Sequence, residues 1–105
     1  MPSGVLGRSD LSAATNTSVY TVPTSKLAVV NVSICNRGTA AASIRLAISS
    51  SSTPGAADYI EYDQPVISAG VLERTGLVLN AGEILVAYSS GANISVVAYG
   101  FEENA

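Results

Sequence analysis

The sequence predicts an all-β fold: a single-domain antiparallel β-sandwich of seven to eight strands, with jelly-roll or immunoglobulin-like architecture. Short runs of β-branched residues alternate with clusters of Gly, Pro, Asn and Ser, and the 3.6-residue period of helices is almost absent. A chain of 105 residues has the length of one domain, so we expect residues 1–105 to share one core. Seven or eight strands exceed what one sheet with a single covered face accommodates, which favours two sheets packed face to face.

The first elements expected along the chain are an arm and two strands. Residues 1–17 are expected to form an N-terminal arm, and residues 19–22 a short strand that ends at Pro23, because proline cannot donate to a ladder. Residues 27–36 show the clearest strand pattern, because apolar residues recur at every second position. The predicted core face of this strand consists of Ala28, Val30, Val32 and Ile34.

The next strand is predicted at residues 42–49. Its inward side chains are expected to be Ile44, Leu46 and Ile48, and its outward ones Ser43, Arg45 and Ala47. The residues Asn36-Arg37-Gly38 form a turn signal, so the strands at 27–36 and 42–49 are predicted to pair as a hairpin.

The second half of the chain is expected to contain one long loop and four strands. Residues 49–55 are polar and rich in Ser, with Pro and Gly at the end, which predicts an exposed loop. Pro65 either interrupts the strand that follows or places it at an edge. The gaps are short enough for consecutive strands to be antiparallel neighbours. The four strands are expected at 58–67, 71–79, 83–89 and 93–101.

The charge content favours contact with other protein subunits over contact with nucleic acid. Charged residues make up 12% of the chain, about half the usual share of a soluble domain. The formal net charge is −3 and the five basic residues are scattered, whereas binding to phosphates needs a concentrated basic surface. A surface of Ser, Thr, Asn, Gly and Ala is easily desolvated, so we expect it to be covered by neighbouring subunits.

Membrane insertion and covalent cross-links are not expected. No stretch approaches the roughly 18 to 20 uninterrupted apolar residues of a membrane-spanning helix. The first ten residues lack the basic start and apolar run of a secretory signal, which predicts synthesis in a cytoplasm. The single cysteine, Cys35, excludes an intrachain disulfide and is interpreted as a small packed side chain.

The residues of common catalytic sites are missing or isolated. The chain has no histidine, which excludes Ser-His-Asp and Cys-His catalysis and histidine-ligated zinc. Glu61 and Asp63 are expected on one strand face, roughly 7 Å apart, and with Asp58 they could form a carboxylate pair or a calcium site. Such carboxylates are more often a solvated face. We therefore predict no catalytic residue, no cofactor and no metal, and a protein that is not an enzyme.

Tyrosines provide most of the aromatic surface, because the chain has no tryptophan and one phenylalanine. Tyr59 and Tyr62 lie close together in the strand expected at 58–67. Aromatic side chains on a β-face can stack on sugars or anchor a protein interface, and the alternative is that they fill the core.

Several motifs together resemble a known group of proteins. These are Val19-Tyr20-Thr21-Val22-Pro23, the run from Val30 to Gly38, Arg45-Leu46-Ala47-Ile48, Tyr59-Ile60-Glu61-Tyr62-Asp63, the segment 77–82, and the ending 93–96 with Gly100-Phe101-Glu102. Their order and spacing are similar to those of small all-β virion structural proteins of tailed bacteriophages, and the resemblance covers residues 19–102. The motifs are signatures of strands and turns, and none of them is catalytic.

The resemblance implies a non-enzymatic virion protein that is assembled in the host cytoplasm. We favour a capsid decoration, or cement, protein that stabilises the phage head as a homo-oligomer, a trimer by analogy, in contact with the major capsid protein. The alternative is a tail, baseplate or fibre component, in which the loop at 49–55 and the neighbouring tyrosines bind a receptor or glycan. The candidate interface residues are Val5, Leu6 and Leu11 in the N-terminal arm and Tyr59 and Tyr62.

Overall fold

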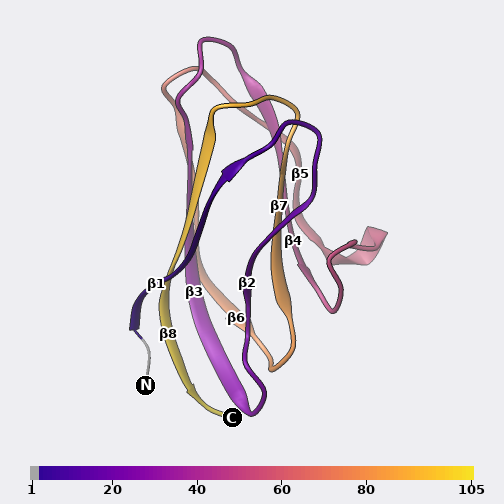
Figure 1. Cartoon of the computed structure of the whole chain (residues 1–105), viewed down its shortest axis with the longest axis vertical. Helices are drawn as coiled ribbons and strands as arrows, with labels where there is room; N and C mark the ends of the chain where they lie inside the picture. Colours follow the sequence, from indigo (N-terminus) through magenta and orange to yellow (C-terminus); the bar gives the residue numbers. More distant parts are fainter. Residues whose placement is uncertain (1–2) are drawn as a thin grey trace.

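A computed structural model describes residues 3–105, which form eight strands and one short 3-10 helix (Figure 1). The elements are β1 (Ser3–Leu11), β2 (Thr17–Thr21), β3 (Lys26–Asn36), β4 (Ala42–Ser49), η1 (Ala56–Asp58), β5 (Tyr59–Val66), β6 (Val71–Leu79), β7 (Ile84–Ser89) and β8 (Ile94–Asn104). The strands form two four-stranded antiparallel sheets. Sheet A has the order β1-β8-β3-β6, and sheet B has the order β2-β7-β4-β5. The predicted antiparallel β-sandwich is therefore confirmed.

The strand order is that of a jelly roll. The ladders include the nested pairs β1 with β8, β2 with β7, β3 with β6, and β4 with β5, so the chain resembles one long hairpin that has been rolled up. The two ends of the sequence consequently meet in sheet A, where Ser3 lies opposite Phe101. Of the two architectures left open by the sequence, the strand order selects the jelly roll.

The predicted hairpin between residues 27–36 and 42–49 is wrong. Strand β3 belongs to sheet A and β4 belongs to sheet B, so the connection between them crosses the sandwich. Among the described strands, β4 and β5 are the only consecutive pair that shares a ladder. Packed sheets lie about 10 Å apart and paired strands about 4.8 Å apart. Because a short connection can span either distance, its length does not reveal which one it spans.

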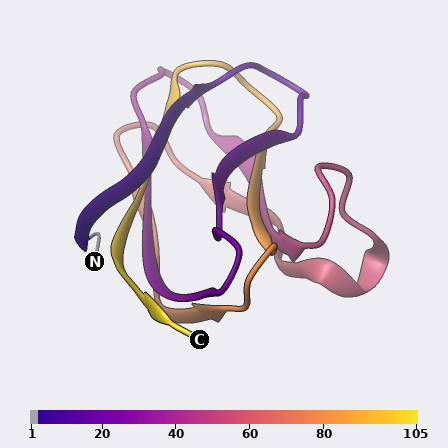
Figure 2. The ribbon, with the colours of Figure 1, turned by 60° about the horizontal axis from the view of Figure 1, so that its bottom comes forward.

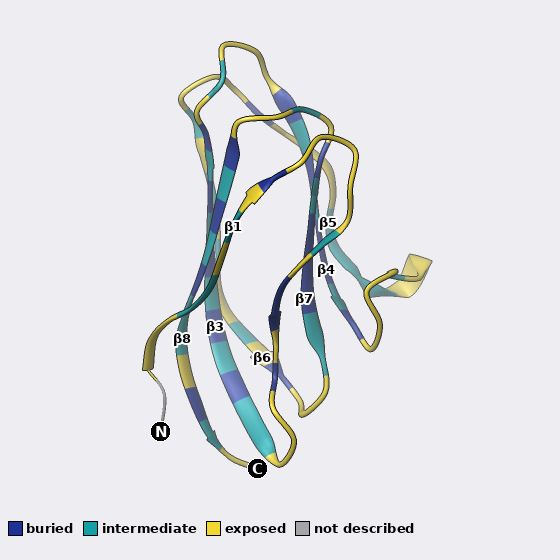
Figure 3. Ribbon diagram, in the orientation of Figure 1, coloured by how far each residue is buried: buried dark blue, intermediate teal, exposed yellow. Residues whose placement is uncertain are grey.

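The positions of the strands agree closely with the prediction. The strands expected at 42–49 and 71–79 have the bounds of β4 and β6, and the last strand extends to Asn104. The alternation in β3 is complete, with all four predicted core residues fully buried. Figure 3 shows this alternation as buried and intermediate bands along β3. In β4, Ile44 and Leu46 are buried, and Ile48 packs against the core as expected.

The segment expected as an N-terminal arm contains β1, which pairs with β8 at the edge of sheet A. At Gly7 this strand passes very close to β2, because a Cβ added to Gly7 would lie 2.2 Å from the carbonyl oxygen of Val19. The close approach joins the edges of the two sheets on this side. At the other side of sheet B, the connection between β4 and β5 carries η1 and projects from the sandwich (Figure 2).

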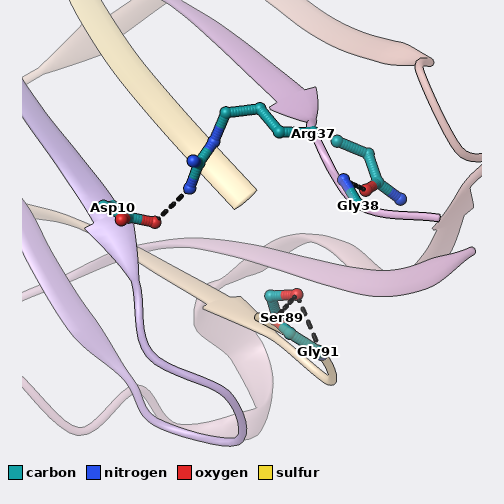
Figure 4. Close-up of polar contacts among 6 residues, drawn as sticks. Asp10, Arg37, Gly38, Ser89 and Gly91 are labelled. Atoms are coloured by element: carbon teal, nitrogen blue, oxygen red, sulfur yellow. Dashed lines mark hydrogen bonds and ion pairs between the residues drawn. The ribbon is translucent and has the colours of Figure 1, made fainter. Parts of the chain in front are cut away.

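Polar contacts close the end of the sandwich where β1, β3 and β7 end (Figure 4). The buried Asn36 donates through Nδ2 to the carbonyls of Ala40 (2.9 Å) and Val66 (3.0 Å), and its Oδ1 accepts a hydrogen bond from the Gly38 amide (2.8 Å). Next to this turn, Arg37 forms an ion pair with Asp10 at 2.5 Å. The turn signal at residues 36–38 thus marks a satisfied polar network that ends β3.

Candidate functional site

Residues 3–105 form no enclosed site, and their clustered apolar and aromatic side chains lie on the surface. No pocket is found in the part of the chain that the structure describes, and residues 3–105 contain no group of three or more Asp, Glu or Cys side chains placed to hold a metal ion. None of the described helices is long and apolar enough to cross a membrane. Exposed apolar side chains and clustered tyrosines occupy the two outer faces of the sandwich.

The outer face of sheet A carries most of the exposed apolar side chains. Val29 points outward, because its neighbours Ala28 and Val30 are buried in the core. Phe101 and Val78 lie directly opposite Val29 on the adjacent strands, so they share this face, and they are 40% and 58% exposed. The next row along the strands contains Val5 and Tyr99. We call these five residues the apolar face: Val5, Val29, Val78, Tyr99 and Phe101.

The apolar face spans all four strands of sheet A. Val5 comes from β1, Tyr99 and Phe101 from β8, Val29 from β3, and Val78 from β6. Because these side chains stand in two adjacent rows, they are contiguous and not scattered singly. Contiguous exposed apolar surface on a chain with so few charges is typical of a protein contact.

The outer face of sheet B carries a cluster built around Arg45. The guanidinium carbon of Arg45 lies 4.2 Å from the ring centre of Tyr62 and 4.6 Å from that of Tyr88. Tyr59 meets Tyr62 edge to face, with ring centres 4.9 Å apart. Both geometries are favourable, since a cation is attracted to ring faces and aromatic pairs prefer the edge-to-face arrangement. We call the set of Arg45, Tyr59, Tyr62, Asp63 and Tyr88 the tyrosine cluster.

A β-bulge in β5 creates this cluster. Ile44 pairs with Gln64 and Leu46 with Glu61, so both Tyr62 and Asp63 lie opposite the single residue Arg45. Asp63 adopts a left-handed conformation, with φ of 55°. Its two carboxylate oxygens accept hydrogen bonds from Nε (2.6 Å) and from a terminal nitrogen (3.3 Å) of Arg45. The hydrogen bond to Asp63 also raises the pKa of Arg45.

The expectation that Glu61 and Asp63 share a strand face is wrong, because the bulge reverses the alternation between them. Glu61 lies opposite the core residue Leu46 and forms an ion pair with Arg74 of β6 across the open edge of the sandwich. Asp63 points to the outer face and is bound by Arg45. The two carboxylates are therefore held by separate arginines on different sides of sheet B.

The structure separates the five candidate interface residues. Tyr59 and Tyr62 belong to the tyrosine cluster, and Tyr62 is 59% exposed; Val5 belongs to the apolar face and is 51% exposed. Leu11 is a core residue with 2% exposure, and Leu6 packs against the core. These two leucines therefore pack β1 onto the sandwich; the Leu11 side chain is covered within the chain, whereas Leu6 is only partly buried.

Sequence reasoning missed Arg45 and Tyr88 on one face and, on the other, Val29, Val78, Tyr99 and Phe101. A signal for the apolar face was present in β3, where Val29 stands among the residues that face away from the core. Cys35 also lies on this outer side and is only partly buried.

Comparison of the chain with protein-family models, with curated proteins and with solved structures returned no match.

A buried polar contact joins the two sheets. The hydroxyl of Tyr20 in β2 donates a hydrogen bond to the carboxylate of Glu102 in β8, and both residues are buried. Burial, followed by the hydrogen bond to Glu102 and its negative charge, raises the pKa of Tyr20. The contact links sheet A to sheet B, and no pocket is found beside it in residues 3–105.

Proposed function

We propose that this chain is a non-enzymatic virion structural protein, a capsid decoration protein that stabilises a phage head through contacts between subunits. The observation that carries the proposal is the presence of two contact surfaces on opposite faces of one sandwich. The apolar face lies on the outer side of sheet A, and the tyrosine cluster lies on the outer side of sheet B. A protein that reinforces a shell must hold at least two neighbours at once, and two opposed surfaces provide for that.

The chemistry of the two surfaces supports a role in assembly. Tyr and Arg are enriched in the energetically important centres of protein interfaces, and the tyrosine cluster contains three tyrosines around one arginine. Apolar side chains on sheet A lose little on desolvation. Repetition of modest contacts by symmetry gives a stable assembly without any single strong bond. The resemblance to small virion proteins of tailed phages, described above, points to the same role.

The decisive experiment locates the protein in its particle. Purified chain is mixed with expanded phage heads that lack it, and the heads are sedimented and heated. We expect co-sedimentation in hundreds of copies and a higher disruption temperature of the heads. A Tyr62→Ala variant, which removes an exposed ring of the tyrosine cluster, is expected to bind less, whereas Thr24→Ala in the connection between β2 and β3 serves as an exposed control. Absence of binding to heads contradicts the decoration role.

A second candidate function is binding of a receptor glycan as part of a tail or fibre. It is favoured by one observation: the exposed ring of Tyr62 lies beside the polar groups of Arg45 and Asp63, and aromatic rings stack on sugars. The exposed residues 50–53 precede β5, the strand that carries Tyr62. If this alternative is right, host cells or their polysaccharide retain the chain, and the chain does not bind phage heads. The Tyr62→Ala variant is then expected to lose that retention.

A further inference from the structure

We infer that two copies of this chain associate face to face through sheet A, about a two-fold axis that runs along the strands between β8 and β3. This inference goes beyond the proposed virion role, because it concerns self-association of the purified chain. It replaces the trimer implied by the resemblance with a two-fold pair. Its basis is a row of side chains on the outer face of sheet A that is complementary to itself.

The row contains one positive and one negative charge at opposite edges of the sheet. Arg8 of β1 lies opposite Val97, Val97 lies opposite Ser33, and Ser33 lies opposite Glu73 of β6. All four point outward, because the residues that flank Val97 are buried in the core. Three strand spacings, roughly 14 Å, separate Arg8 from Glu73. Neither residue takes part in an ion pair within residues 3–105.

The proposed axis brings these unused charges together. A two-fold axis along the strands superposes β1 of one copy on β6 of the other at the same height, so that Arg8 meets Glu73 of the second copy. Symmetry creates this pair twice, once at each edge of the interface. A two-fold axis across the strands would instead place like charges in the same half of the interface, so charge complementarity selects the first axis.

The centre of one row of the apolar face is complementary under the same operation. Val29 of one copy lies over Phe101 of the other, because β3 and β8 exchange places and these two residues occupy one row. Val78 at the edge of that row lies over Ser3 of the second copy. The contacts between Val29 and Phe101 near the axis are therefore apolar, Tyr99 in the next row lies over Asn31 of the second copy, and the charges lie at the edges. Of the other charged groups on this face, Asp10 is already neutralised by Arg37 and Glu103 lies near the C-terminal end.

The available area is sufficient for a specific contact. The edge strands β1 and β6 each have nine residues, and four strands lie side by side. The face therefore measures roughly 30 Å by 19 Å, which gives about 600 Å² per copy and about 1,200 Å² in total. This total lies at the lower bound of standard interfaces and above the roughly 1,000 Å² expected of a biological contact.

A charge swap tests the inference. Sedimentation equilibrium of the wild-type chain is expected to show a monomer–dimer equilibrium. Arg8→Glu and Glu73→Arg are each expected to raise the dissociation constant about tenfold, because each places two like-charge pairs at the interface edges. The double variant is expected to return to within about threefold of the wild-type value. Restored dimerisation of the double variant cannot come from an ion pair within one copy, because residues 8 and 73 are too far apart there.

Controls distinguish the interface from general effects of charge. Ser18→Glu adds a charge to the outer face of sheet B and is expected to leave dimerisation unchanged, while Val78→Glu on the apolar face is expected to abolish it. Circular dichroism confirms that each variant is folded. A wild-type monomer at every concentration, a trimer, or a double variant as weak as either single variant overturns the inference.

Discussion

At the scale of single residues, the buried pair of Tyr20 and Glu102 shows how a hydrogen bond allows polar groups to lie in the core. Glu102 lies opposite the core residue Ala28, so its carboxylate is carried into the sandwich by the strand alternation. A buried carboxylate is tolerated only when it is hydrogen bonded, and the Tyr20 hydroxyl provides that bond from the other sheet. The pair therefore ties β2 to β8 where each would otherwise hold an unsatisfied group.

Removal of the Tyr20 hydroxyl is expected to destabilise the fold. Tyr20→Phe leaves the buried carboxylate without its partner, which lowers the free energy of unfolding at neutral pH by about 1–3 kcal/mol. The raised pKa of Tyr20 contributes stability that is fully present below the unfolded value of about 10 and is lost as the pH rises above it. The difference between wild type and Tyr20→Phe should therefore shrink above about pH 10.

Urea unfolding followed by circular dichroism at neutral and alkaline pH measures both effects. Tyr99→Phe is the matched control, because it removes the same hydroxyl from the outer face of sheet A. This control is expected to unfold within about 0.5 kcal/mol of the wild type. If Tyr20→Phe is as stable as the control at neutral pH, the contact with Glu102 contributes nothing to folding.

At the scale of secondary-structure elements, sequence alone predicts positions well and partners poorly. The strands β3, β4 and β6 are visible because side-chain alternation is a local property, set by the two faces of each strand. Pairing is a long-range property: β3 and β4 are separated by only five residues and still lie in different sheets. The sequence predicts an arm and no strand at β1. A bulge near Leu6 interrupts the alternation of apolar and polar residues there, and most residues of this edge strand are exposed, so few of them are apolar.

The residues of the candidate site differ in the same way: residue type predicts some of them, and strand pairing decides the others. Tyr59 and Tyr62 could be selected from residue type alone, since clustered tyrosines on a strand are typical of contact surfaces. The contact of these tyrosines with Arg45 could not be predicted from residue type, because it depends on a bulge that places two residues of β5 opposite one residue of β4. The apolar face likewise depends on strands that are distant in sequence, such as β3 and β8, lying side by side.

The contact between β1 and β2 depends on the absence of a side chain at Gly7. Gly7→Ala would place its Cβ 2.2 Å from the backbone carbonyl of Val19, so the two edge strands must move apart. We expect a loss of about 2 kcal/mol or more in the free energy of unfolding, measured by urea denaturation. Gly55→Ala is the control, because its nearest neighbour would be the Asp58 carboxylate at 3.6 Å, an ordinary contact. Equal stability of the two variants would contradict the close approach.

At the scale of the whole molecule, the nested pairing joins the two ends of the chain. Strand β8 lies between β1 and β3, so it supplies ladder partners to both, whereas β1 lies at the edge and, within residues 3–105, pairs with β8 alone. The last strand also contributes Ile94, Val96 and Ala98 to the core. Contacts between residues so distant in sequence form late, because loop closure must precede them.

Two truncations are therefore expected to differ sharply. Deletion of residues 94–105 removes the strand between β1 and β3 and should abolish the β-sheet signal in circular dichroism. Deletion of residues 1–11 removes an edge strand and should leave a chain that still melts cooperatively, at a lower temperature. A synthetic peptide of residues 94–105, added to the first truncated chain, should restore the signal, because all its ladder partners remain present. A cooperative transition in the chain that lacks residues 94–105, without the peptide, would show that sheet A does not depend on β8.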